Sequence, residues 1–249
     1  MSAISIALIA VACCAAASGV GVLLHICLPD HHLKGNSKDV INLILGLIGT
    51  MSALVLSLLI ASASSIYSTQ SSELQGLAGD IVEMDRSLIR YGTGTEAARA
   101  SLRTLTVLQI DQIWSSHKGA LEGSAPADAM TQFLTAVVGL RPTNDVQAFI
   151  RNQVLQDITS ATHTRVTMAE QSGRIPVPFL TVLLFWISVL FLGFGMFSDM
   201  NGTVAVAMLI GAISVGGAVF LILELSSPYE GLMQLSDQPL RNAIAHIGH

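Results

Sequence analysis

The sequence predicts an all-α, polytopic membrane protein with four transmembrane helices and a helical extramembrane domain inserted between the second and third. Apolar runs at residues 5–28, 40–66, 177–197 and 203–225 are each about 20 residues long or more, enough for a helix to cross a bilayer core. The mean hydropathy is +0.63, and charged residues make up 12% of the chain, against about 25% in soluble domains. Most charged residues lie between the two pairs of runs.

The first run, residues 5–28, contains no Lys, Arg, Asp or Glu, and it contains all three cysteines. The spacing of Cys13, Cys14 and Cys27 does not suggest a zinc site, so we interpret them as small packing residues. Residues 15–17 resemble a signal-peptide cleavage site. Because a positive n-region is missing and the apolar run continues beyond them, we predict a membrane span instead.

The polar connection at residues 28–39 contains the cluster Asp30, His31 and His32, and His25 precedes this cluster by one to two helical turns. Imidazole and carboxylate groups bind first-row metals, and histidine changes charge near neutral pH. These residues are therefore either a pH-responsive or weak metal site or the polar side chains of an interfacial turn. Adjacent histidines do not easily converge on one ion, which favours the turn.

The second run carries a polar stripe of small or polar residues at spacings of three and four, while its leucines point elsewhere. One interpretation is a close helix-packing seam, because small residues let backbones approach. The other is the wall of a pore in a ring of subunits, because water and ions pass along hydroxyls and backbone dipoles. Both interpretations stay open. The polar stripe consists of Asn42, Gly46, Thr50, Ala53, Ser57, Ala61 and Ser64.

We predict that the second helix continues without interruption to Tyr91, because it contains no proline and its apolar residues keep a spacing of three and four. The Gly-Thr-Gly at 92–94 ends it, and further helices are predicted at about 95–116, 128–138 and 142–172. The residues expected to be buried in this segment are Leu74, Leu77, Ile81, Met84, Leu88, Tyr91, Leu102, Leu105, Ile113, Met130, Phe133, Leu134, Val137, Val146, Phe149, Ile150, Val154, Ile158 and Ala161.

The third and fourth runs are joined by the turn at 198–202, and the fourth contains one acid, Glu224, close to its end. An intramembrane carboxylate is functional by default when it is central, whereas one near an end fits an interface residue bound by an arginine or a backbone amide. We predict domains at 1–66, 67–176, 177–227 and 228–249. Four spans place the termini and the helical domain on one side of a cell membrane, which we predict is the cytoplasm.

The composition excludes several classes of function. A net charge of −5 without a basic face argues against nucleic-acid binding. We find no Walker loop, G-x-S-x-G, H-E-x-x-H or dinucleotide fingerprint, so we predict neither an enzyme nor a cofactor.

The chain resembles the bestrophin-like family of bacterial membrane proteins, as five stretches show. They are LPDHHL (28–33), GLIGTMSALVLSLLIASA (46–63), DIVEMDRSLIRYG (80–92), GFGMF (193–197) and LILELSSPYEGLM (221–233). The resemblance implies similarity to bestrophins, pentameric anion channels in which four spans per subunit surround a pore lined by the second span. Bestrophin pores narrow at large apolar side chains, whereas this chain has Ala53 and Ser57 at that depth, so anion selectivity does not transfer.

The leading prediction is therefore an oligomeric, passive ion channel in contact with membrane lipid and inorganic ions, lined by the second span. The resemblance favours a pentamer. The alternative is a non-conducting sensor or scaffold whose helical domain binds a partner protein. A histidine-dependent metal transporter is a third interpretation.

Overall fold

The computed structural model describes residues 2–27, 36–114, 125–170, 177–198, 201–229 and 231–247. Within these ranges the regular structure is helical throughout. The chain divides into two compact units. The first unit consists of Met1–Tyr67 and Gly173–Met233, and the second unit of Ser68–Ser172 and Gln234–His249.

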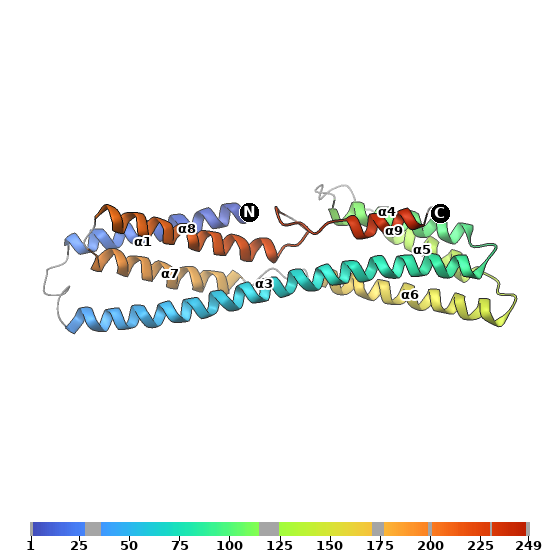
Figure 1. The fold of residues 1–249 in the computed structure, drawn as a ribbon, viewed down its shortest axis with the longest axis horizontal. Coiled ribbons are helices and arrows are strands. Elements are labelled where there is room, and N and C mark those ends of the chain that lie inside the picture. Colours follow the sequence, from blue (N-terminus) through green and yellow to red (C-terminus); the bar gives the residue numbers. More distant parts are fainter. Residues whose placement is uncertain are drawn as a thin grey trace. The chain divides into compact units, whose positions relative to one another are not determined.

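Two parts of the predicted fold class are confirmed: the described residues form an all-α chain, and four of its helices are long and apolar enough to cross a membrane. They are α1 (Ala3–Cys27), α3 (Asn36–Tyr91), α7 (Val177–Phe197) and α8 (Gly202–Leu225) (Figure 1). The outer surface of these helices is rich in large apolar side chains, including Leu8, Leu43 and Phe185, which are 63%, 75% and 63% exposed. Such a surface fits lipid rather than water.

The core of the first unit lies between α1, α7, α8 and the first half of α3. α1 packs against both α7 and α8. The buried residues of this core are Cys14, Leu59, Leu183, Ile187, Phe191, Ala212 and Ile222.

Helix α3 is 56 residues long, which corresponds to about 84 Å at 1.5 Å per residue. A bilayer core takes only about 30 Å of that length. The helix ends at Tyr91, and the following Gly92 and Gly94 have φ angles of +101° and +92°, a conformation that side chains with a Cβ resist. The glycines therefore stop the helix at the place that the sequence predicts.

The second unit contains the rest of α3 together with α4 (Glu96–Trp114), α5 (Ala125–Val138), α6 (Asp145–Glu170) and α9 (Gln238–His246). The predicted apolar stripe of α3 is confirmed, since its members are at most 4% exposed. These members are Leu74, Leu77, Ile81, Met84, Leu88 and Tyr91.

A partly buried ion pair joins α3 to α4. Arg99 Nε lies 2.6 Å from Asp85 Oδ1, and its Nη2 lies 3.2 Å from Oδ2. The Asp85 side chain is only 4% exposed. A two-point contact of this kind fixes direction as well as distance, so it sets how α4 lies on α3.

The C-terminal segment is part of the second unit. α9 packs on α4, with Leu240, Ala243 and Ile247 buried. Trp114 Nε1 donates to the carbonyl oxygen of Leu235 at 2.8 Å, and Arg99 Nη2 donates to that of Ile247 at 3.3 Å. These contacts attach the segment from Gln234 onward to the helical bundle of the second unit.

Three of the predicted core positions are wrong. Leu134, Val146 and Phe149 are 41%, 67% and 70% exposed. Gln147 Nε2 donates to the carbonyl oxygen of Tyr91, the last residue of α3. Val146 therefore lies level with the chain beyond the end of α3, where no turn of that helix remains to cover it.

Candidate functional site: the membrane face of α3

All members of the polar stripe are exposed on the surface of the first unit. Helix α3 packs on the rest of this unit through a different face, with Leu45, Ser52, Leu59 and Ala63 at most 8% exposed. At about 100° per residue, roughly 120° of helix rotation separates the centres of these two faces. The exposed stripe residues are Asn42, Gly46, Thr50, Ala53, Ser57, Ala61 and Ser64.

A third face of α3 forms a leucine ridge, which we define as Leu43, Leu47, Leu54 and Leu58. Their exposed fractions lie between 61% for Leu47 and 75% for Leu43. The ridge borders the polar stripe on the side away from the packed face. Helix α3 thus presents small and polar groups on one uncovered face and tall apolar groups on the next.

The hydroxyl groups of α3 lie in different environments. Thr50 Oγ1 donates to the carbonyl oxygen of Leu47 at 2.8 Å, which satisfies it within the helix. Ser52 Oγ is buried and, within the part of the chain that the structure describes, has no hydrogen-bond partner. The Ser57 residue is exposed. The face of the helix on which a serine lies, and not its residue type alone, therefore determines whether its hydroxyl group is available to water or ions.

Close backbone packing occurs between α1 and α7 instead of along the polar stripe. A Cβ atom added to Gly21 would lie 2.2 Å from the carbonyl oxygen of Leu192, and one added to Gly195 would lie 2.3 Å from that of Ser18. Real Cβ atoms essentially never come this close. By contrast, a Cβ on Gly46 of the polar stripe would meet nothing within 4 Å. The small-residue seam of this chain is thus the contact between α1 and α7.

Glycines also admit side chains of neighbouring helices at the contacts of α8 with α1 and of α7 with α3. A Cβ on Gly216 of α8 would lie 2.4 Å from Val11 Cγ2 of α1, and a Cβ on Gly193 of α7 would lie 2.4 Å from Leu45 Cδ1 of α3. These glycines were not predicted from the sequence to lie at helix contacts. Their spacing in the apolar runs was visible, but the partner of each helix was not.

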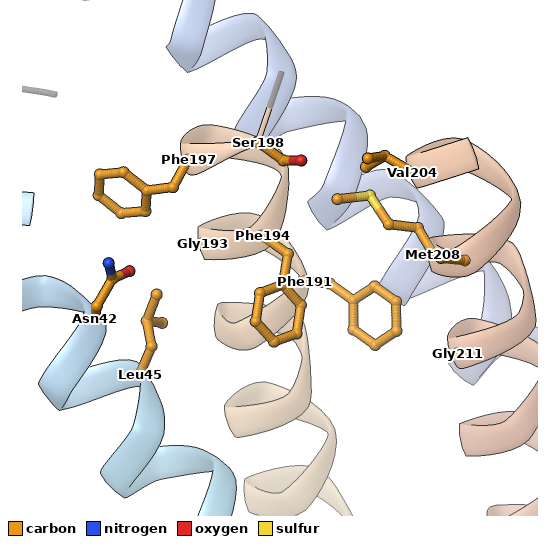
Figure 2. A pocket seen from close by; sticks show the side chains of 11 residues that line it. Asn42, Leu45, Phe191, Gly193, Phe194, Phe197, Ser198, Val204, Met208 and Gly211 are labelled. Atoms are coloured by element: carbon orange, nitrogen blue, oxygen red, sulfur yellow. The ribbon is translucent and has the colours of Figure 1, made fainter. Parts of the chain in front are cut away.

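An apolar groove lies beside the polar stripe, between α3, α7 and α8 (Figure 2). Its volume is about 450 Å³. Phe191 and Phe194 of α7 lie between Leu45 of α3 and Met208 of α8 in this view. Asn42, the first member of the polar stripe, stands at the α3 side of the groove.

His25 of α1 forms a hydrogen bond with the backbone of α7. Its Nδ1 lies 2.8 Å from the carbonyl oxygen of Met196, in the last turn of α7. This contact satisfies one of the carbonyls that a helix end leaves without a partner. Asp30, His31 and His32 lie outside the described residues. Among the described residues, no group of three or more His, Cys, Asp or Glu side chains is placed to hold a metal ion.

Glu224 is buried, with 4% of the residue exposed, and it binds backbone amides. Its Oε2 accepts hydrogen bonds from the N–H groups of Leu232 at 2.7 Å and Met233 at 3.1 Å. Gly231 has a φ of +93°, and a Cβ on it would lie 2.3 Å from Glu224 Oε2. The carboxylate therefore ties the chain that follows α8 back onto the end of the helix.

Comparison with known proteins identifies a domain family. The model of the Bestrophin-like domain matches residues 11–240 of this chain. The match takes in all four candidate membrane spans, apart from the first residues of α1, and the helices between them. Among curated proteins, none matches the chain.

Proposed function

This chain belongs to the Bestrophin-like family of membrane proteins, and on that premise we propose that copies of it assemble around an axis to form a passive ion-conducting path lined by the polar stripe of α3. Nothing in the sequence suggests a nucleotide site, so the ions move down their own gradient. The oligomer is a pentamer in the cell membrane, with the second unit and both termini in the cytoplasm.

The observation that carries this proposal is the exposure of the entire polar stripe. Asn42 and Ser57 place polar groups on a face of α3 that the chain itself leaves uncovered, whereas the Thr50 hydroxyl on this face is already bonded to the carbonyl oxygen of Leu47. Lipid offers no hydrogen bonds to such groups, so in a membrane they favour water or another protein surface.

The order of faces around α3 supports a ring. The packed face holds α3 against α7, where Gly193 admits Leu45. The leucine ridge offers apolar side chains to lipid or to a neighbouring copy. The polar stripe lies between these two faces, and when copies close around an axis it borders a lumen in which hydroxyls and backbone dipoles face ions.

Three serines of α3 allow a matched test of this proposal. Ser57 belongs to the polar stripe, whereas Ser62 is exposed about 140° further round the helix and Ser52 is buried. Ser57→Leu adds apolar bulk to the lumen in every copy, so we expect a reduced current through reconstituted bilayers and a normal yield of folded oligomer. Ser62→Leu makes the same chemical change outside the lumen and leaves the current unchanged.

Two results would contradict the proposal. Equal currents from the Ser57→Leu and Ser62→Leu proteins would show that the stripe does not line the path. Loss of the oligomer in Ser57→Leu alone would show a seam between copies, because leucine overpacks a close contact at a cost of about 1–3 kcal/mol.

A second candidate function is a scaffold whose second unit binds a partner protein. It is favoured by large apolar residues exposed where α5 ends and α6 begins, among them Val138, Val146 and Phe149 at 58%, 67% and 70%. Exposed apolar clusters mark interaction surfaces. Phe149→Ser would abolish partner capture in a scaffold and leave ion current unchanged in a channel.

A further inference from the structure

The register of α3 and α6 in the second unit brings two aspartates to the same level. Gln70 Nε2 of α3 donates to the carbonyl oxygen of Met168 of α6 at 3.3 Å, and Gln147 Nε2 of α6 donates to that of Tyr91 of α3 at 3.0 Å. Both bonds imply the same antiparallel register. In that register Asp80 of α3 is level with residues 157 and 158 of α6, of which 157 is an aspartate.

Asp157 has one oxygen that is bound and one that is not. Its Oδ1 accepts a hydrogen bond from Gln153 Nε2 at 2.9 Å, which orients the carboxylate. Its Oδ2 is buried and has no hydrogen-bond partner within the described part of the chain. A buried acceptor without a donor is costly, so this oxygen calls for an O–H or N–H group.

No basic side chain compensates the two aspartates, since neither forms an ion pair in the ranges that the structure describes. Burial, and then the charge of Asp157, raise the pKa of Asp80 above its ordinary value of 3.8. The other charged or titratable side chains near this level on α3, α4, α5 and α6 are Glu73, Glu83, Asp85, Arg86, Arg99, Arg103, Asp111, Asp128, Arg151, His163 and Arg165.

We propose that Asp80 and Asp157 share a proton and so form a pH-sensitive contact between α3 and α6. Asp80 takes up the proton from solvent, and its new O–H group donates to Oδ2 of Asp157. The net charge of the pair falls from −2 to −1, and the orphaned oxygen gains its donor. When the proton leaves, two carboxylates repel each other across the helix contact.

The direction of the pH effect follows from the raised pKa. A carboxyl group whose pKa is higher in the folded protein than in the unfolded chain favours folding when it is protonated. The contribution of Asp80 is fully present below 3.8 and is lost as the pH rises through its raised pKa. The contact between α3 and α6 is therefore tighter in mild acid than at neutral pH.

The test compares three variants of the full chain in detergent micelles by thermal unfolding between about pH 4 and about pH 7. Asp80→Asn provides an N–H donor for Asp157 Oδ2 at every pH, and Asp157→Asn removes one of the two charges. For both we expect a midpoint about 2–4 °C above wild type at neutral pH and no difference in acid. Glu83→Gln, at an exposed position where Glu83 pairs with Arg90, should keep the pH profile of wild type.

Variants that shift the midpoint equally at all pH values would overturn the proposal, because a merely structural role has no pH dependence. A second measurement does not depend on any variant. In wild-type protein with ¹³C-labelled aspartate carboxyls, we expect one aspartate to titrate clearly above the others. Titration of every aspartate near the ordinary value would equally overturn the proposal.

Discussion

Replacing Gly195 by alanine tests the helix packing of the first unit. An alanine Cβ at this position of α7 would lie 2.3 Å from the carbonyl oxygen of Ser18 and 3.1 Å from the backbone nitrogen of Val22, both on α1. Ordinary van der Waals contact begins at 3.4 Å. Because both obstacles are backbone atoms, no side-chain rotation relieves the clash, and α1 must move away from α7.

The magnitude follows from the size of this gap. Restoring contact requires a separation of about 1 Å, and overpacking of this kind costs about 1–3 kcal/mol. Alanine returns at most about 1 kcal/mol through its higher helix propensity. Because each kcal/mol lowers the midpoint of unfolding by about 2–4 °C in a chain of this size, we expect a clear decrease.

The assay is thermal unfolding of the purified protein in detergent, with Gly217→Ala as the matched control. Gly217 lies in α8, and a Cβ there would meet nothing within 4 Å. We expect the control to unfold at or above the wild-type midpoint. A midpoint for Gly195→Ala that equals that of Gly217→Ala would refute the close approach of α1 and α7.

Three further predictions concern other parts of the chain. Leu88→Asp puts an unpaired charge at a position that is 0% exposed, so the second unit should become sensitive to protease; a wild-type digestion pattern would contradict this. Glu224→Ala removes the acceptor of two backbone amides, including that of Met233, at a cost of about 1–3 kcal/mol, and should speed cleavage after α8. In a background without native cysteines, Gln156→Cys and Asn201→Cys should react with an impermeant thiol reagent from opposite faces of the membrane, whereas labelling from the same face would end the four-span topology.

Long, regular patterns in the sequence predicted most of the fold. The apolar spacing from Leu74 to Tyr91 predicted the buried face of α3 correctly, because a helix of this length keeps its period and because its partners cover it on the same side. The end of α3 was predictable from Gly92 and Gly94 because glycine readily adopts positive φ angles, and both residues do so in the structure.

The predictions of buried residues failed where burial depends on which other helix packs against the residue, because the sequence pattern of one helix does not identify its partner. Val146 continues the apolar period of α6, but α3 has already ended at that level, so it does not cover Val146, which is 67% exposed. The close approach of α1 and α7 at Gly21 and Gly195 could not be predicted either. A glycine in an apolar run permits close helix packing, but the sequence does not indicate which helix packs there.

The polar stripe was predictable as a pattern but not as a surface. Its spacing placed Thr50 and Ser57 on one face of the second span, and packing or a lumen explained that equally well. In the structure, α7 packs on a different face of α3, as the contact of Gly193 with Leu45 shows. The polar stripe is therefore exposed.

The most direct test of the proposed lumen is the water accessibility of the polar stripe in the assembled protein. In a cysteine-free background, Ser57→Cys and Ser62→Cys are each exposed to a charged, water-soluble thiol reagent in sealed membranes, because a thiol reacts as the thiolate and so requires water. We predict rapid modification of the cysteine at 57 and little at 62. Modification at 62 but not at 57, or at neither, would contradict a water-filled path along the stripe.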